Sequence, residues 1–319
     1  MAHSVRQFRS ILVPLDGSPF AEQAVPLALA IGRAARSKVR LALVHQVPAT
    51  PLSVEAARFY TSMELAVRKS ERDYLRRLAT QSRKPRGPQV VSALLSGPVD
   101  TTLTHYVRDS GADLVVMSTH GRGPLHRAWL GSVADHLIRN LEVPVLLVRP
   151  QEGESVAAGP PSIKQVMVPL DGSRLAEAAL VPAASLARLL GAEVMLLQVV
   201  EPLIADTTPL GPHSLGYDYD ADFTALRRSE AHDYLKGLAE RLGQEGVRAN
   251  AAAVLGPTVA GTILDMARRE GVDLMAVATR GHGGIRRLAF GSTADKLVRA
   301  AEVPVLVIRP TKPSRSVSG

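Results

Sequence analysis

The chain contains the stretch RSILVPLDGSPFAEQA (Arg9 to Ala24) and, 155 residues later, the related stretch KQVMVPLDGSRLAEAA (Lys164 to Ala179). The C-terminal parts of the two halves match at an offset of 160, with 20 identities in the 40 positions of residues 111–150 against 271–310. Agreement of this kind within one chain indicates an internal duplication. The sequence therefore predicts two copies of one domain in tandem.

Each copy alternates short apolar runs with amphipathic stretches, the pattern of strands followed by helices. The first run, Ser10 to Leu15 or Val166 to Leu170, is apolar throughout, as expected for a strand buried on both faces. Strands alternating with helices predict an α/β fold, a doubly wound parallel sheet with helices on both faces. Further strands are expected at residues 39–47, 89–95, 113–118 and 143–148, and at 193–200, 248–255, 273–278 and 303–308.

Local signals refine this outline. Ser18 and Pro19 fit the N-cap and the first position of a helix. Pro26 and Pro182 fall inside the helices after the first strands, where we expect a kink or a shortened first turn. The predicted organisation is a first domain at 1–150, a linker at 151–161, a second domain at 162–310 and a disordered tail at 311–319.

Composition narrows the class of protein. No stretch approaches the roughly 20 uninterrupted apolar residues of a membrane span, and the N-terminus has no apolar run after its charges. The chain has no cysteine, which excludes a disulfide framework, a thiol nucleophile and a thiolate metal site. We therefore expect a cytoplasmic protein with no membrane partner.

The net charge of +8 is unevenly distributed. Residues 1–160 carry 20 Lys+Arg and 13 Asp+Glu, giving +7, whereas residues 161–319 carry 18 and 17, giving +1. A basic surface can attract nucleic acid, anionic lipid or a polyphosphate. Only 4% of the residues are aromatic and none interleaves with an Arg cluster, which argues against nucleic acid and favours a solvated Arg-rich face.

A glycine motif follows the fourth strand of each copy and is the strongest candidate for chemistry. Glycine lets a phosphate approach the backbone without a clashing Cβ. The residues after the last glycine look like helix starts, whose free N–H groups and dipole favour an anion. Recurrence in both copies favours such a site over a plain turn and N-cap. The motif is Ser118-Thr-His-Gly121, nine residues, Gly131-Ser132 in one copy and Ala278-Thr-Arg-Gly281, nine residues, Gly291-Ser292 in the other.

Six nearby side chains could supply charge to such an anion site: His120, Arg122, Arg127, Arg280, His282 and Arg287.

An aspartate ends the first strand of each copy, in Asp16-Gly17-Ser18 and in Asp171-Gly172-Ser173. Ligands of open parallel sheets bind beyond the carboxyl ends of the strands, where the strand order reverses. A carboxylate there can accept hydrogen bonds from ribose hydroxyls while the glycines hold phosphates. Taken alone, each aspartate is better explained as a helix cap.

Four motifs taken together resemble those of the universal stress protein family. They are VPLDGS at the first strand, Gly-Pro after the third strand, the glycine motif after the fourth, and VPVLLVRP or VPVLVIRP at the last strand. The resemblance covers essentially the whole chain, twice. It implies a strand order of 3-2-1-4-5 and, in one subgroup, ATP binding in each domain. Ser118 and Ala278 stand where the ATP-site pattern of that family has glycine.

The resemblance also implies roles for single residues. Asp16 and Asp171 would contact ribose, and Gln46 and Val199, at matching places on the second strand, would offer backbone groups to adenine. The residues implied to hold the phosphates are Gly121, Gly131, Ser132, Val133, Gly281, Gly291, Ser292 and Thr293.

The leading hypothesis is a regulatory or stress-response protein that binds ATP, with magnesium as a counter-ion, as a signal or structural ligand. Efficient phosphoryl transfer needs metal ligands and a positioned base, yet the chain has no GxxxxGK[ST] segment and no carboxylate pair beside the glycine motif. We therefore name no catalytic residue and no protein metal site, and expect at most slow ATP hydrolysis, with His120 or His126 as a candidate base.

Two other functions stay open. Phosphorylation of Asp16, as in receiver domains, is disfavoured because the fifth strand lacks the lysine that such sites use. A nucleotide-free interaction scaffold is the remaining alternative.

The VPVL segments are short, apolar strands that would expose a pairing edge in an isolated domain. The family resemblance implies that the two copies pack through them as a pseudo-two-fold pair. A homodimer of the whole chain would fit as well.

Overall fold

The computed structural model describes residues 8–46, 54–119, 130–150, 162–202, 216–279 and 291–310, with the backbone alone at 54–60 and 216–220. The described helices and strands fall into two compact units, one within Arg6–Ser162 and the other within Ile163–Gly319. The predicted linker at 151–161 and tail at 311–319 lie outside the described residues, and the packing of one copy against the other stays a prediction. No helix in the described ranges has the length and apolar composition needed to cross a membrane.

Each unit is a five-stranded parallel sheet, and the order in the first unit is β3-β2-β1-β4-β5. The predicted α/β class and strand order are confirmed. The elements of the first unit are β1 (Ser10–Leu15), α1 (Pro19–Glu22), α2 (Val25–Ala34), β2 (Lys38–His45), α3 (Val54–Ser82), β3 (Gln89–Ser96), α4 (Val99–Asp109), β4 (Leu114–Ser118), α5 (Ser132–Asn140) and β5 (Val145–Val148).

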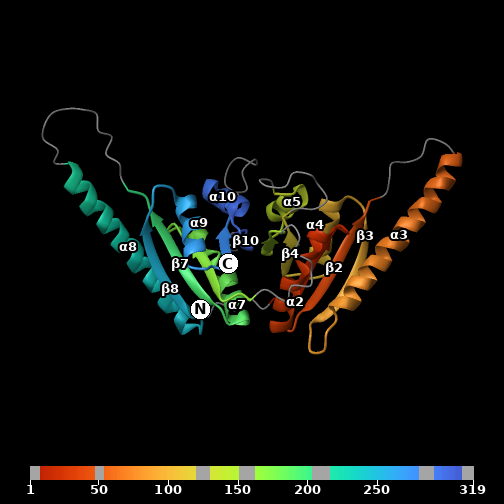
Figure 1. Ribbon diagram of the computed structural model, residues 1–319, viewed down its shortest axis with the longest axis horizontal. Coiled ribbons are helices and arrows are strands. Elements are labelled where there is room, and N and C mark those ends of the chain that lie inside the picture. Colours follow the sequence, from red (N-terminus) through yellow and green to blue (C-terminus); the bar gives the residue numbers. More distant parts are fainter. Residues whose placement is uncertain are drawn as a thin grey trace, which may run out of the picture. The chain divides into compact units, whose positions relative to one another are not determined.

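The second unit repeats this order as β8-β7-β6-β9-β10, again with parallel pairing. Figure 1 shows the same succession of strands and helices in both units. Its elements are β6 (Gln165–Pro169), α6 (Arg174–Glu177), α7 (Leu180–Leu190), β7 (Glu193–Val200), α8 (Gly216–Gln244), β8 (Ala249–Leu255), α9 (Val259–Arg269), β9 (Leu274–Ala278), α10 (Ser292–Ala300) and β10 (Val305–Ile308).

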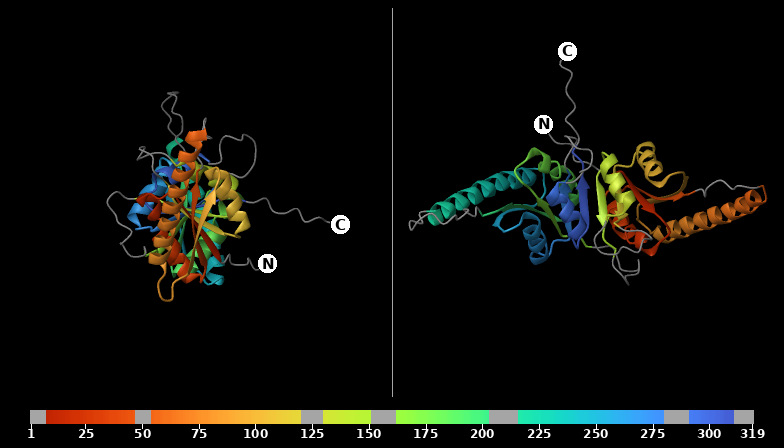
Figure 2. Two further views of the ribbon diagram at one scale, coloured as in Figure 1. Left: turned by 90° about the vertical axis from the view of Figure 1, so that its right-hand side faces the viewer. Right: turned by 90° about the horizontal axis from the view of Figure 1, so that it is seen from above.

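Helices cover both faces of each sheet. In the right-hand view of Figure 2, the first unit has α2 and α3 on one face and α4 on the other. All six residues of β1 are buried, which is why that strand reads as a continuous apolar run. The long helices α3 and α8 pack on β2 and β3 and on β7 and β8, and their N-terminal parts extend beyond the sheet (Figure 1).

The helix after the first strand is broken in two, as its internal proline predicted. In the first unit α1 ends at Glu22 and α2 starts at Val25, with Pro26 in its first turn. Proline is tolerated there because the N–H groups of a first turn have no helical partner. The second unit has the same break between α6 and α7, with Pro182 near the start of α7.

An aspartate braces the two central strands at their amino ends. The Asp113 carboxylate accepts hydrogen bonds from the backbone N–H of Arg9 at 2.8 Å and of Ser10 at 3.0 Å. Asp273 does the same for Lys164 at 2.7 Å and Gln165 at 2.9 Å. The brace therefore ties the start of β4 or β9 to the start of β1 or β6 in both units.

Candidate functional site

The loop after the first strand has one geometry in both units. In the first, Gly17 has φ +80°, and the Ser18 N–H donates to Asp16 Oδ1 at 2.8 Å. The Ser18 hydroxyl oxygen accepts from Ala21 N at 3.2 Å and so caps α1, as predicted. Since serine is the cap, Asp16 is not needed for capping and instead closes a turn with one carboxylate oxygen.

The second unit repeats this loop residue for residue. Gly172 has φ +80°, the Ser173 N–H donates to Asp171 Oδ1 at 2.9 Å, and the Ser173 hydroxyl oxygen accepts from Ala176 N at 3.1 Å. Asp171 is exposed and Asp16 is half-buried. Both carboxylates therefore stand at the carboxyl edge of the sheet with hydrogen-bonding capacity left over.

The fourth strand ends beside this loop. Pairing of Ile11 with Leu114 puts Asp16 level with Thr119 when the register is continued along the strands. The chain runs from β1 to β2 on one side and from β4 to β5 on the other, so the strand order reverses between β1 and β4. Open α/β sheets bind their ligands at such a point. Ser118 is buried at the end of β4, and Ala278 is half-buried at the end of β9.

Helices α5 and α10 begin next to this edge with a glycine as N-cap. Gly131 (φ −58°, ψ 148°) and Gly291 (φ −67°, ψ 155°) give their helices no side-chain cap. The Gly131 N–H donates to Thr119 O at 3.0 Å, and a Cβ on Gly131 would lie 3.1 Å from that same oxygen. Glycine is therefore what lets the helix start pack this closely against the end of β4.

The first helical hydrogen bonds leave several N–H groups of these helices without a helical partner. The first bond of α5 runs from Asp135 N to Gly131 O, and that of α10 from Asp295 N to Gly291 O, both at 2.9 Å. The residues between them therefore point N–H groups outward, where an anion is favoured. These residues are Ser132, Val133, Ser292 and Thr293 of the predicted site, together with Ala134 and Ala294.

The acidic residue in the first turn of each helix is paired. Asp135 accepts from Arg139 Nε at 2.7 Å, and Asp295 accepts from Arg299 Nε at 2.9 Å. Each arginine offsets a carboxylate that would otherwise oppose an anion at the helix start. The other predicted phosphate contacts and nearby charged residues lie outside the described residues: Gly121, Gly281, His120, Arg122, His126, Arg127, Arg280, His282 and Arg287.

The predicted equivalence of Gln46 and Val199 is wrong. Ser10 pairs with Lys38, and Gln165 pairs with Glu193, so the offset of 155 continues through the second strand. Gln46, exposed just after β2, therefore matches Glu201, and Val199, inside β7, matches Val44. Apolar runs such as ALVHQV and LLQVVE align about equally well at neighbouring offsets, and only the strand pairing separates them.

Sequence reasoning missed a tyrosine–glutamate hydrogen bond beside Asp171 and a half-buried tyrosine at the matching place beside Asp16. The Tyr234 hydroxyl on α8 donates to Glu177 Oε1 on α6 at 3.0 Å. Burial raises the pKa of Tyr234, and the charges of Glu177 and Asp171 raise it further. The matching Tyr74 is more buried, and its pKa is raised for the same reasons, by burial first and then by Glu22 and Asp16.

The Tyr234–Glu177 bond connects the long helix α8 to α6, the short helix that follows the aspartate loop. Two repeated segments in the sequence contain these residues: Asp-Tyr-Leu in the long helices and Ala-Glu in the short first helices. They aligned the copies but did not show that the tyrosine and the glutamate meet in space.

A second polar cluster exists in the first unit at the end of β2. His45 is buried, its Nδ1 lies 2.7 Å from Glu71 Oε2, and its Nε2 lies 3.9 Å from Glu64 Oε1. Arg68 Nε lies 3.1 Å from the same Glu64 oxygen. At the matching place in the second unit, Val200 packs with Ala231 and Ala253. In the described ranges, no group of three or more His, Asp or Glu side chains could hold a metal ion.

Both halves of the chain match one family model, described as the universal stress protein family, over residues 7–149 and 162–309. The chain belongs to the universal stress protein family. The family resemblance inferred from the motifs is thereby confirmed. The ATP-binding type stays a prediction.

Relatives within the family are distant in sequence. A universal stress protein of Mycobacterium tuberculosis is 29% identical over 198 residues, which is 62% of this chain and 62% of that protein. The match thus spans less than two thirds of that relative. A universal stress protein from Methanocaldococcus jannaschii is 27% identical over 152 residues, which is 47% of this chain and 84% of that protein. A universal stress protein from Bacillus subtilis is 28% identical over 148 residues, which is 46% of this chain and 98% of that protein.

Solved structures share the fold. A universal stress protein from Archaeoglobus fulgidus superposes with a TM-score of 0.66 at 17% identity, over 95% of this chain and 99% of that one. A putative universal stress protein from Pseudomonas aeruginosa gives 0.58 at 16% identity, over 95% and 94%. A universal stress protein solved in complex with cAMP gives 0.33 at 22% identity, over 45% and 98%.

Proposed function

We propose that each unit binds one molecule of ATP at the carboxyl edge of its sheet, and that the chain acts as a nucleotide-responsive regulator in the stress response. The observation that carries this proposal is a recurring pair of features. In both units an aspartate held in a turn follows the first strand, and a glycine-capped helix without a side-chain cap begins beside the fourth.

The helix starts suit the phosphates. Ser132 and Ser292 are the first helical residues and are exposed, so their N–H and hydroxyl groups are accessible to a ligand. A helix N-terminus carries about half a positive charge and a set of free donors, which together favour phosphate. We assign the phosphates to these serines with Val133 and Thr293, and, as the glycine motif implies, to Gly121 and Gly281.

The aspartate turns suit the ribose. A carboxylate has about four acceptor positions, and the bond from Ser18 or Ser173 uses only one of them. Asp16 and Asp171 can therefore accept from the ribose hydroxyls while holding their loops. Gln46 stays our candidate for adenine in the first unit. In the second unit Glu201, not Val199, stands at the matching strand position, so the base would be recognised differently there. Magnesium would then be held by the phosphates themselves.

Equilibrium dialysis of nucleotide-stripped protein against ATP tests the proposal. We expect two ATP per chain, and weaker binding of dideoxy-ATP, which lacks both ribose hydroxyls. The double variant Asp16→Asn, Asp171→Asn keeps the Oδ1 acceptor of each turn but replaces the other acceptor oxygen with an NH2 donor, so its preference for ATP over dideoxy-ATP should be clearly smaller.

Absence of binding at millimolar ATP would overturn the proposal and favour the nucleotide-free scaffold. If the double variant still preferred ATP over dideoxy-ATP as strongly as the unmodified chain, the role of the aspartates would be overturned, but ATP binding itself would not. Phosphate release measured on the same samples tests slow hydrolysis.

A further inference from the structure

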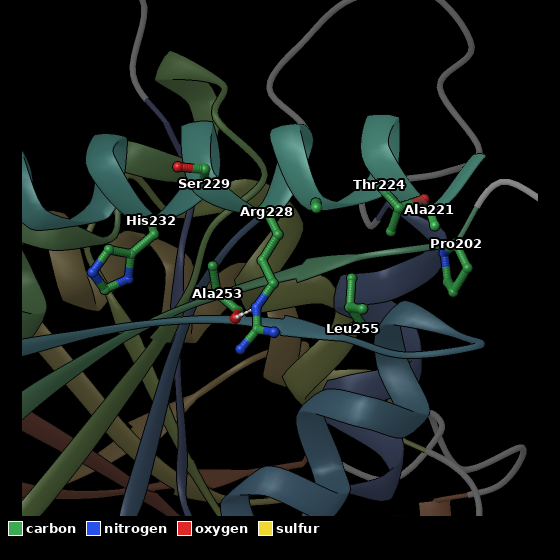
Figure 3. Close-up of a pocket in the computed structure, with 9 residues that line it drawn as sticks. Pro202, Ala221, Thr224, Arg228, Ser229, His232, Ala253 and Leu255 are labelled. Atoms are coloured by element: carbon green, nitrogen blue, oxygen red, sulfur yellow. Dashed lines mark hydrogen bonds between the residues drawn. The ribbon is translucent and has the colours of Figure 1, made fainter. Parts of the chain in front are cut away.

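The second unit contains an open groove between the long helix and the edge of its sheet. It has a volume of about 640 Å³ and lies between α8 and the edge strand β8. In Figure 3, Arg228 and His232 extend from α8, Leu255 lies on β8, and Pro202 follows β7. The groove is thus separate from the edge between β6 and β9, where we place the nucleotide.

The groove coincides with a set of small side chains. The long helices align at an offset of 160 through their Asp-Tyr-Leu segments. The third strands align at 159, because Gly97 N bonds to His45 O as Gly256 N bonds to Val200 O. Four pairs of residues then match at this place, large in the first unit and small in the second: His45 and Val200, Glu64 and Thr224, Glu71 and Ala231, Leu94 and Ala253.

In the first unit polar side chains take up this position, with a hydrogen bond between His45 and Glu71 and an ion pair between Glu64 and Arg68. In the second unit Thr224 and Ala253 line the groove instead. The same backbone framework therefore has a polar cluster in one copy and an accessible groove in the other.

The lining combines apolar surface with a fixed positive charge. Leu255 is 45% exposed although it lies on a strand, and Pro202, Ala221 and Ala225 add further apolar surface. The Arg228 Nε donates to Ala253 O at 2.9 Å, which holds the guanidinium over the groove (Figure 3). Arginine has five N–H donors and stays charged at any physiological pH.

Arg228 lacks a carboxylate partner within the described ranges. Its counterpart in the first unit, Arg68, has Glu64 beside it, and the second unit has Thr224 there instead. His232 follows one helical turn later on the same wall. Among the described residues, the groove therefore places a cation without a carboxylate partner next to exposed leucine, proline and alanine.

We propose that this groove binds a small amphipathic anion, an apolar chain with a carboxylate head held by Arg228. Its volume falls within the range of about 300–1,000 Å³ for small-molecule sites. The apolar chain would cover Leu255 and Pro202, and the head would take the donors of the guanidinium that Ala253 O does not use. This site does not depend on ATP binding.

Displacement of a fluorescent probe, dansyl-labelled undecanoate, from the full chain tests the proposal. We expect decanoate to displace the probe, decanol to displace it more weakly, and acetate, which lacks the chain, not to displace it. Arg228→Gln should weaken decanoate by about tenfold or more, the loss for a hydrogen bond between charged groups, and leave decanol unchanged.

Two further variants complete the design. Ala253→Leu introduces the side chain that the first unit has at Leu94, and should abolish binding by filling the groove. Arg68→Gln, the matched change in the first unit, should leave binding unchanged. Any one of three results would overturn the proposal. The Ala253→Leu variant could bind as the unmodified chain does, the Arg228→Gln variant could keep its decanoate affinity, or millimolar decanoate could fail to displace the probe. The exposed Arg228 can be changed without affecting folding, so the test stands even if Ala253→Leu fails to fold.

Discussion

The starts of α5 and α10 allow a single donor to be removed without harming the helix. Ser132 and Ser292 are the first residues of these helices, after glycine caps in extended backbone. Proline is favoured at a first helical position, because its fixed φ suits the helix and its missing N–H has no helical partner. A residue before proline must be extended, as both caps are. Ser132→Pro and Ser292→Pro should therefore fold normally and lose one N–H in each proposed phosphate site.

The size of the effect follows from the type of bond. A hydrogen bond to a charged group contributes about 1.5–3 kcal/mol, and each 1.4 kcal/mol is tenfold in affinity. The alanine variants Ser132→Ala and Ser292→Ala lose the hydroxyl but keep the N–H. We therefore expect each proline variant to bind ATP about 10–150-fold more weakly than its alanine partner at that site.

Isothermal titration calorimetry with ATP measures both the affinity and the number of sites. Ser132→Pro alone should leave one strong site per chain, and the double proline variant should leave none. Thermal unfolding should stay close to that of the unmodified chain, since each helix keeps all its internal hydrogen bonds. A folded proline variant that binds ATP as tightly as its alanine partner would refute the assignment of this N–H to phosphate.

Three further predictions concern the framework. Because burial raises the pKa of Tyr74 and Tyr234 above the ordinary 10.0, the folded chain favours the protonated phenols. The contribution of these two tyrosines to the unfolding free energy is fully present below pH 10 and is lost as the pH rises further. Ultraviolet titration should show about one phenolate fewer in the native than in the denatured protein near pH 10, where ordinary tyrosines are half ionised, and about two fewer one to two pH units higher. Gly97 has φ +133°, so Gly97→Ala should lower the unfolding free energy by about 1–3 kcal/mol in urea; an unchanged midpoint would contradict this. Asp113→Ala should cost a similar amount, about 1–3 kcal/mol, by leaving two backbone donors unpaired, and equal stability in a urea titration would show that the brace is not needed.

Most of the fold could be predicted because the strands are apolar throughout. The predicted strands start and end within two residues of the observed ones, as for β1 at Ser10–Leu15 and β7 at Glu193–Val200. Ser18, Pro19 and Pro26 gave correct local signals, since caps and proline effects depend on neighbours in sequence. The strand order followed from the family resemblance rather than from periodicity.

Contacts between distant segments could not be predicted in this way. The brace by Asp113 and the pairing of Tyr234 with Glu177 join residues 104 and 57 positions apart. Nothing in either local sequence indicates the partner. The false match of Gln46 with Val199 has the same origin, because the register of a strand is set by its neighbour in the sheet. The contrast between His45 and Val200 became visible only once that register was known.

The brace of β1 by Asp113 also bears on how two similar sheets avoid mixing their strands. The Arg9 N–H finds its partner 104 residues later in the chain, so β1 stays incomplete until β4 has been synthesised. The helices and strands of each unit nevertheless lie within one continuous stretch of sequence, and β9 follows β4 by 160 residues. At about 5–20 residues per second, translation gives the first sheet about 8–30 s before the competing strand exists. Domains with mixed α/β topology fold within milliseconds to seconds. The spacing of the duplication thus protects the chain against strand exchange during synthesis, a hazard that would return on refolding the full-length protein from denaturant.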